Sequence, residues 1–494
     1  MDSDLKSLFC SYVDIVRKTI QPQYAREEAQ RSEGLVILSN KVLELQALVD
    51  ELENSELFNR LVRKTVASFP QNPHFGYASA ARAVGHFFRR SRCYIDVFKN
   101  HVTDPEALFQ TYEHACQRQE RQVTYLVPLE GVGFSEPRMD FGRFEIQLFR
   151  LRQLNELLRN DVNEYFYHDA IIDVTRLICF FICCRATENL SDIYRYIDNF
   201  YEELLHPHPI AESYTHYPKN IEEIITILSL YDWNIDHDKR TREIVLLSNM
   251  PSGYRNRLYV PFYIKLTDDL LDGPEKTPDF SKLVDIEEYF HDETGEKIGE
   301  GPTIYNEFDV DMTKHFKSFV GHITSLFENI FEKQDQCRFF DIAKGYFVKA
   351  CFEMNLLDEL LYYIIALEAL FGEREKGISV RLSTRLALVL GKNQNERNMI
   401  HGNFGRLYCF RCDIVHGGHI QAPMYEGHVR QAHEFVRRAL IWFLQYLNDA
   451  AACGSIPARE WLLKKLDVAQ HPGVRLQDVP PGFPRVQEWM KWIE

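Results

Sequence analysis

Residues 407–418 read LYCFRCDIVHGG, and this pattern predicts the carboxyl end of a helix. Leu407, Phe410 and Ile414 recur with the period of an apolar helical stripe. Two glycines follow directly after His416. Because glycine takes the left-handed conformation of a helix terminus without penalty, the helix is expected to stop there, with His416 at its end.

Arg411 stands five residues before His416, and the two side chains together suit phosphodiester chemistry. A helix dipole favours a protonated imidazole at the carboxyl end. An imidazole can transfer protons, and the planar fork of a guanidinium can hold two phosphate oxygens. From spacing alone, the alternative is a solvated arginine and a capping histidine without a catalytic role.

Two apolar helical runs precede this segment, LLDELLYYIIALEALFGE at 356–373 and GISVRLSTRLALVLG at 377–391. Their order, spacing and apolar pattern, together with the arginine and histidine of 407–418, resemble the R-x4-6-H signature of HEPN domains. These are helical nucleotide-binding and RNase domains, and the chain is similar to their Apea-like branch. The resemblance implies a HEPN-like helical bundle over residues 309–453.

The resemblance also implies a metal-independent endoribonuclease that needs no cofactor and acts as an anti-phage or abortive-infection effector on RNA, with tRNA as one candidate. Arg411 and His416 would be the catalytic residues, supported by Cys412 and Asp413. HEPN relatives work as dimers, so a homodimer with a composite site is expected, under the control of a phage or cellular trigger. Many active members carry a polar residue directly after the arginine, where this chain has Cys412.

Two alternatives to a nuclease stay open. The first is a HEPN module that binds nucleotide or RNA without cutting it, for which Cys412 is the main argument. The second is a dimerisation domain that serves the middle of the chain.

Glu368 falls inside the apolar face of the helix predicted over 356–371. Since a buried carboxylate without a partner is costly, we expect Arg381 or Arg385 of the next helix to pair with it. The pair would either fix helix packing alone or orient Arg411.

The net charge of −15 at first disfavours a nucleic-acid binder, because phosphate contacts need cations. Residues 379–440, however, hold nine lysines and arginines, among them Arg406, against four acids. This local surplus indicates either a focused RNA site or a solvated helix face.

Near the N-terminus, HFFRRSR at 86–92 mixes aromatic and basic residues. Its arginines, Arg89, Arg90 and Arg92, could contact single-stranded RNA. Alternatively, the stretch could be core on one face and solvated on the other.

The fold class expected from these patterns is α+β and mostly helical. Alternating apolar residues in RQVTYLVPL and GRFEIQLF predict strands, and the run VTRLICFFICC predicts a buried strand whose cysteines are core thiols rather than metal ligands. Five regions follow in order: a helical N-terminal region (1–120), a β-containing sensor or substrate-positioning module (121–271), an acidic Gly/Pro-rich linker (272–308), the HEPN-like domain (309–453) and a C-terminal tail (454–494).

The sequence contains no apolar run of about 18 residues, which predicts no transmembrane helix. The N-terminal residues lack the basic and apolar regions of a signal peptide. The eleven cysteines are scattered, as in a reduced protein. A cytoplasmic location, without a membrane partner and without a bound metal, is therefore expected.

Overall fold

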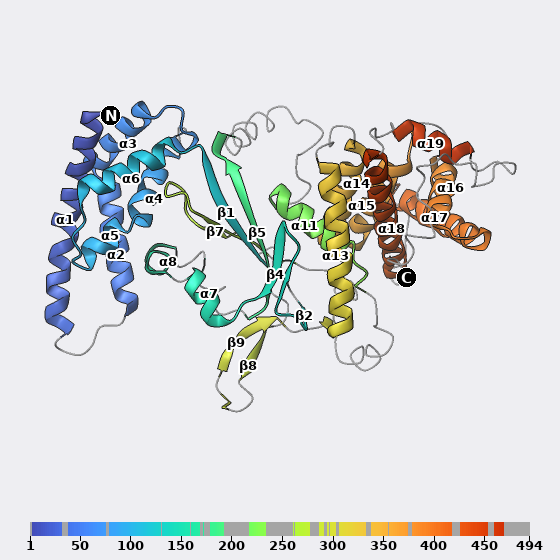
Figure 1. The fold of residues 1–494 in the computed structure, drawn as a ribbon, viewed down its shortest axis with the longest axis horizontal. Coiled ribbons are helices and arrows are strands. Elements are labelled where there is room, and N and C mark those ends of the chain that lie inside the picture. The colour runs from blue at the N-terminus through green and yellow to red at the C-terminus, as the bar shows by residue number, and fades with distance from the viewer. Residues whose placement is uncertain are drawn as a thin grey trace. The chain divides into compact units, whose positions relative to one another are not determined.

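The computed structural model describes residues 2–31, 38–75, 79–129, 131–158, 160–167, 171, 178–191, 217–233, 260, 262–276, 286–290, 294–295, 297–302, 306–331, 337–353, 355–373, 378–416, 425–452 and 459–468. The chain forms two compact units: unit 1 is Met1–Gly133, Pro137–Pro209 and Val260–Asn306, and unit 2 is Phe134–Glu136, Ile210–Tyr259 and Glu307–Glu494. The mostly helical α+β class is confirmed (Figure 1). None of the described helices is long and apolar enough to cross a membrane.

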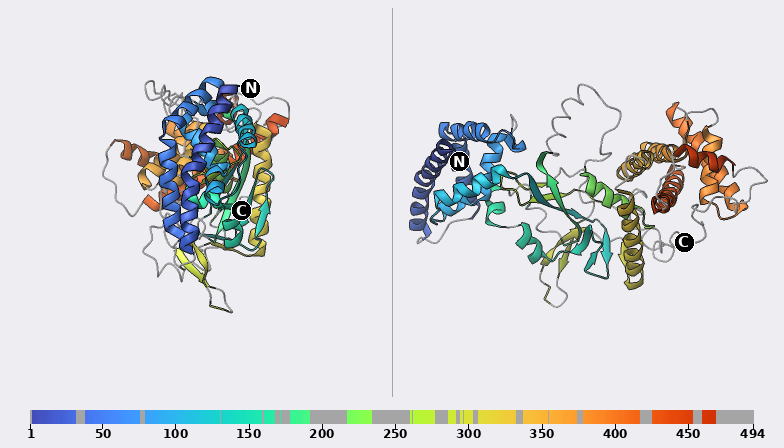
Figure 2. Two further views of the ribbon diagram at one scale, coloured as in Figure 1. Left: turned by 90° about the vertical axis from the view of Figure 1, so that its left-hand side faces the viewer. Right: turned by 45° about the horizontal axis from the view of Figure 1, so that its top comes forward.

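Unit 1 begins with helices that gather beyond one end of strand β1 (Figures 1 and 2). They are α1 (Ser3–Arg31), α2 (Leu38–Glu53), α3 (Glu56–Ser68), the 3-10 turn η1 (Pro73–Phe75), α4 (Ala80–Arg90), α5 (Cys93–Phe98) and α6 (Pro105–Gln117). Local signals set their ends: the Asp104 side chain accepts the first-turn N–H of α6 at 3.0 Å, next to Pro105. Their interior is aromatic and includes Phe9, Tyr12, Phe87, Phe88 and Tyr112.

An antiparallel sheet follows, in the order β3-β4-β5-β1-β6-β7. Its strands are β1 (Glu120–Pro128), β3 (Arg138–Asp140), β4 (Phe144–Leu148), β5 (Phe180–Asn189), β6 (Ile264–Thr267) and β7 (Glu275–Lys276), and helices α7 (Leu151–Leu158) and α8 (Asp161–Phe166) lie between β4 and β5 in sequence. Cys179, Cys183 and Cys184 are buried free thiols, as expected. Burial raises the pKa of Cys183 to about 12. Within the described residues, no three His, Cys, Asp or Glu side chains are placed to hold a metal ion.

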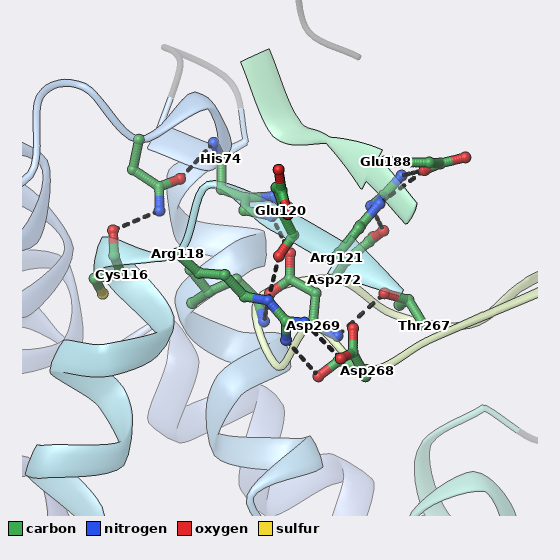
Figure 3. Close-up of polar contacts among 12 residues, drawn as sticks. His74, Cys116, Arg118, Glu120, Arg121, Glu188, Thr267, Asp268, Asp269 and Asp272 are labelled. Carbon is green, nitrogen blue, oxygen red and sulfur yellow. Dashed lines mark hydrogen bonds and ion pairs between the residues drawn. The ribbon is translucent and has the colours of Figure 1, made fainter. Parts of the chain in front are cut away.

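Polar contacts with little exposure join η1 to the segment after β6 and join β1 to its neighbours in the sheet (Figure 3). His74 of η1 lies 2.6 Å from Asp269, which follows β6, and both side chains are buried. On β1, Arg121 pairs with Glu188 of β5 at 2.9 Å and also contacts Asp272. The sequence-based boundary between the helical region and the β-containing module therefore falls inside one compact unit.

Residues 272–308 were expected to be a linker with little order, yet the described residues of this range include regular structure. β8 (Ile286–Phe290) and β9 (Lys297–Pro302) form an antiparallel hairpin, and β10 (Asn306–Phe308) pairs with β2 (Val132–Phe134). The expectation was wrong because main-chain pairing forms these strands, although their side chains are acidic and glycine-rich. The apolar run REIVLLSN at 242–249, which also predicts a strand, lies outside the described residues.

Unit 2 is helical. It contains α11 (Lys219–Ser229), α13 (Val310–Phe331), α14 (Arg338–Phe352), α15 (Leu356–Phe371), α16 (Ile378–Leu390), α17 (Gln394–Val415), α18 (Tyr425–Ala452) and α19 (Arg459–Val468). Helix α18 contacts α13, α14, α15, α16 and α17, and residues 439–447 along it are all buried. In contrast, α17 buries only Ile400, Phe404 and Leu407, so most of its surface faces away from the core.

Helix α19 belongs to this bundle, although the sequence analysis assigned its residues to a separate C-terminal tail. Leu462 and Leu463 are buried. Asp467 accepts two hydrogen bonds from the fully buried Arg385 of α16, at 2.8 Å from Nε and 2.6 Å from Nη2. The bundle therefore extends past residue 453, where the HEPN-like domain was expected to end.

Candidate functional site

The end of α17 lies where the sequence predicted it. At its start, the Asn393 side chain accepts the N–H of Glu396 at 3.0 Å, and the Glu396 carboxylate accepts the N–H of Lys392 at 2.7 Å. These two side-chain caps at Asn393 and the residue before it are a strong local start signal. The helix ends at Val415, and His416 forms the cap, with its N–H donating to Cys412 O at 2.9 Å.

His416 and Arg411 have different surroundings. The His416 side chain is exposed to solvent. The Arg411 side chain is only 28% exposed, and its Nη2 lies 3.9 Å from Glu368 Oε1 on α15. Its guanidinium carbon lies 5.8 Å from the centre of the Tyr408 ring. A carboxylate and an aromatic ring therefore hold the guanidinium on its inner side.

Glu368 does not have the partner that the sequence suggested. It accepts a hydrogen bond from the Tyr408 hydroxyl at 2.9 Å and faces Arg411. Arg385 instead donates to Glu373 at 2.8 Å and to the α19 carboxylate, while Arg381 Nη1 lies 3.6 Å from Glu373. The prediction that Arg381 or Arg385 pairs with Glu368 was wrong, because carboxylates on α19 and just after α15 face these arginines instead, and helix periodicity does not reveal them.

Tyr408 is a site residue that sequence reasoning missed. Burial, followed by the negative charge of Glu368, raises the pKa of Tyr408 to about 12, so the hydroxyl remains a donor at neutral pH. The signal was present in the sequence, because Tyr408 and Arg411 are three residues apart and therefore neighbours on one helix face. Tyr408, Glu368 and Arg411 form one polar cluster between α15 and α17.

Two arginines fix the end of α15, which carries Glu368. Arg385 donates to Phe371 O at 2.6 Å, and Arg459 of α19 donates to Glu368 O at 3.2 Å. Arg459 also donates to Gly372 O. Cations at the carboxyl end of a helix satisfy its last carbonyls and its dipole. The carboxylate that faces Arg411 is therefore carried by a rigid helix end.

Arg411 and His416 point in different directions from α17. At 3.6 residues per turn, a separation of five residues corresponds to about 140° around the helix axis and about 7.5 Å along it. One copy of the helix end thus turns Arg411 toward α15 and His416 toward solvent. A phosphate bound to the outer side of a single helix would meet the imidazole more readily than the guanidinium.

Cys409 and Cys412, two of the cysteines that the sequence interpretation treated as scattered, form a C-x-x-C pair. Both are free thiols, Cys409 exposed and Cys412 partly exposed. Asp413, expected to support Arg411, is exposed. It lies two residues beyond Arg411, about 200° around the helix, so it points away from the guanidinium.

The basic surplus of residues 379–440 is only partly a surface feature. Arg385 and Arg437 are buried in ion pairs, the latter with Glu434 at 2.8 Å. Arg406 is exposed and donates to the Asn403 side chain. The number of cations available to an RNA is therefore smaller than the sequence count indicates.

The N-terminal arginines proposed as RNA contacts are engaged within unit 1. Arg89 pairs with Glu53. Arg90 donates to the carbonyl oxygens of Thr267, Asp269 and Asp272 after β6. Arg92, with a left-handed φ of 65°, precedes α5, and its Nε lies 3.4 Å from Asp96. These contacts favour a structural role over RNA binding.

The chain matches no family model, no curated protein and no solved structure. The function is therefore inferred from the α17 end and its surroundings.

Proposed function

We propose that the protein is a metal-independent endoribonuclease of HEPN type, and that two copies form one cleavage site from their α17 ends. The observation that carries the proposal is that the end of one helix carries both an exposed imidazole, His416, and the guanidinium of Arg411, whose Nη2 lies 3.9 Å from Glu368 Oε1 on the neighbouring helix α15. This combination supplies proton transfer and phosphate binding.

The chemistry follows from RNA itself. The 2′-hydroxyl attacks the adjacent phosphorus, one imidazole takes the hydroxyl proton, and the P–O5′ bond breaks. An imidazolium then gives a proton to O5′, so the products are a 2′,3′-cyclic phosphate and a 5′-hydroxyl. Arg411 stabilises the negative charge of the pentacoordinate phosphorus. Base and acid act in one displacement, which is why two copies of His416 are needed.

A two-fold dimer with antiparallel α17 helices satisfies this requirement only when the helices cross near their carboxyl ends. In an isologous contact between antiparallel helices, equivalent residues lie on opposite sides of the axis. If the two α17 helices crossed at Cys409, the two His416 Cα atoms would be about 21 Å apart along the helices, at a rise of 1.5 Å per residue. A crossing at Asp413 reduces this to about 9 Å. The proposal therefore requires contact at the helix end.

The first experiment measures cleavage of end-labelled RNA in excess EDTA, with identification of a cyclic phosphate on the product. We expect His416→Ala and Arg411→Ala to lower the cleavage rate at least about a hundred-fold. The matched control is Arg430→Ala, which removes an exposed arginine of α18. Cleavage that survives in His416→Ala, or that EDTA abolishes, contradicts the proposal.

A mixing experiment tests the composite site directly. Wild-type protein and His416→Ala are combined in varied ratios under conditions of subunit exchange. If both imidazoles act in one reaction, activity falls with the square of the wild-type fraction. A linear decrease would instead indicate that each copy works independently.

The second candidate function is a HEPN module that binds RNA or nucleotide, or dimerises, without cutting. Cys412, beside Arg411 in place of a polar residue, favours it. In that case no cyclic phosphate forms, while Arg411→Ala weakens RNA binding and reduces its salt dependence. A pure dimerisation module would bind no RNA, either as the wild type or as Arg411→Ala.

If the nuclease is an anti-phage effector, the wild-type protein is expected to stop growth of its host after infection. The His416→Ala protein is expected to have no such effect.

A further inference from the structure

Four side chains of types that ligate metal ions lie on the exposed face at the end of α17. They occupy positions i, i+3, i+4 and i+7 of the helix: Cys409, Cys412, Asp413 and His416. Cys412 is partly exposed and the other three are exposed. Within the described part of the chain, none of the four side chains takes part in a hydrogen bond or an ion pair. Their donor atoms are therefore accessible to a ligand.

Cys412 and His416 form a chelating pair by their spacing. Residues four apart on a helix lie one above the other, with Cβ atoms about 5–6 Å apart. Here the helical hydrogen bond between the two residues, His416 N–H to Cys412 O at 2.9 Å, shows that the helical turn is intact up to the cap. Two side chains at this spacing can bind one zinc ion, as the paired histidines of zinc-binding helices do. Thiolate and imidazole are both preferred zinc ligands.

A single copy does not complete a site. Within the described residues, no three potential ligands converge on one point. Cys409 and His416 are seven residues apart, which corresponds to about 10.5 Å along the helix and exceeds the span of one ion. Two coordination positions therefore remain for ligands from elsewhere. A second copy, related by a two-fold axis near residues 412–416, would present the same thiol and the same imidazole.

We propose that Cys412 and His416 bind Zn²⁺, and that two copies complete a tetrahedral site with two thiolates and two imidazoles. This inference rests on the proposed dimer through the α17 ends. Since the ion uses the imidazole lone pair, bound Zn²⁺ removes His416 from proton transfer. The metal would hold the dimer together in an inactive state, and its removal would release the nuclease.

Cobalt substitution tests the site without any measurement of activity. The full-length protein, stripped of metal and kept reduced, is titrated with Co²⁺ while thiolate-to-cobalt charge-transfer and tetrahedral d–d bands are recorded. We expect saturation at one Co²⁺ per two chains and displacement of the cobalt by Zn²⁺. Cys412→Ser and His416→Gln should each weaken binding about a hundred-fold or more, because each removes two of the four ligands. Cys409→Ser is the matched control, one turn away on the same face, and should leave the bands unchanged.

Three outcomes overturn the inference: no thiolate–cobalt band in the wild type, loss of the band in Cys409→Ser alone, or saturation at one ion per chain. Its failure is distinguishable from failure of the nuclease proposal. RNA cleavage in EDTA without cobalt bands leaves the nuclease and removes the metal site. Cobalt bands with the stated variant pattern, but no cleavage in EDTA, leave the metal site and remove the nuclease. When both hold, Zn²⁺ should inhibit cleavage and EDTA should restore it.

Discussion

Replacing Asp467 with asparagine tests whether α19 is part of the bundle in unit 2. In the structure, its carboxylate receives two charge-assisted hydrogen bonds from Arg385, at 2.8 and 2.6 Å, and Arg385 is fully buried. A hydrogen bond to a charged group contributes about 1.5–3 kcal/mol, and the amide retains one acceptor oxygen. Since the Asp467 side chain is 36% exposed, water screens part of the interaction.

From these terms, we expect Asp467→Asn to lower the free energy of unfolding by about 2 kcal/mol. For a unit of this size, that corresponds to a decrease in Tm of about 4–8 °C. Thermal unfolding of the full chain measures the loss, and amide hydrogen exchange locates it. Exchange should accelerate in α19 and at the carboxyl end of α15, because Arg385 and Arg459 cap that end together.

The matched control is Lys464→Gln, which removes one charge from the same helix at an exposed position. It should change stability by less than about 0.5 kcal/mol. The reasoning is refuted if Asp467→Asn behaves like this control, or if exchange in α15 stays unchanged while α19 opens. Either result would mean that α19 lies on the bundle without supporting it.

Two further predictions concern unit 1. Asp269→Asn should destabilise the protein by about 3 kcal/mol, since it breaks a buried pair with His74. Burial raises the pKa of Asp269, but the hydrogen bond from His74 outweighs burial and lowers this pKa below the unfolded value of about 4. The ionised carboxylate therefore stabilises the folded state above pH about 4, and this stabilisation is lost as the pH falls through the folded pKa. Urea unfolding at pH 3–7 should show a smaller acid decrease in Asp269→Asn than in the wild type; an identical decrease contradicts the assignment. Burial raises the pKa of Glu53 to about 7, despite the opposing effects of Arg89 and Tyr94. The folded state then binds more protons than the unfolded state between pH about 4 and 7, and its stability falls as the pH rises through that window. Glu53→Gln should flatten this part of the profile; an unchanged slope contradicts the reasoning.

Features that depend on neighbouring residues could be predicted from the sequence. The helix end at His416 follows from the stripe of Leu407, Phe410 and Ile414 and the glycines after it. Strand β1 follows from alternating apolar residues, and β5 from a compact apolar run. The pair Tyr408 and Arg411 could also have been found, since its spacing is local. The C-x-x-C motif of Cys409 and Cys412 could also have been found, since it too is local.

Contacts between distant segments could not be predicted in this way. Periodicity placed Glu368 on an apolar face, and only the tertiary structure brought Tyr408 and Arg411 to it rather than Arg385. Similarly, Arg90 reads as a solvated or RNA-binding cation, yet carbonyls almost 180 residues later accept its hydrogen bonds. A buried charge takes whichever acceptor the fold supplies, and the sequence around it carries little information about that choice.

By itself, the sequence determined where helices and strands form and that an arginine and a histidine flank the end of one surface helix. Tertiary structure decided which way those two side chains face, which carboxylate holds the arginine, and that α19 completes the bundle. The physical reason is range: helix and strand formation depend on residues within a few positions, whereas the partner of a charge depends on which segments fold against it.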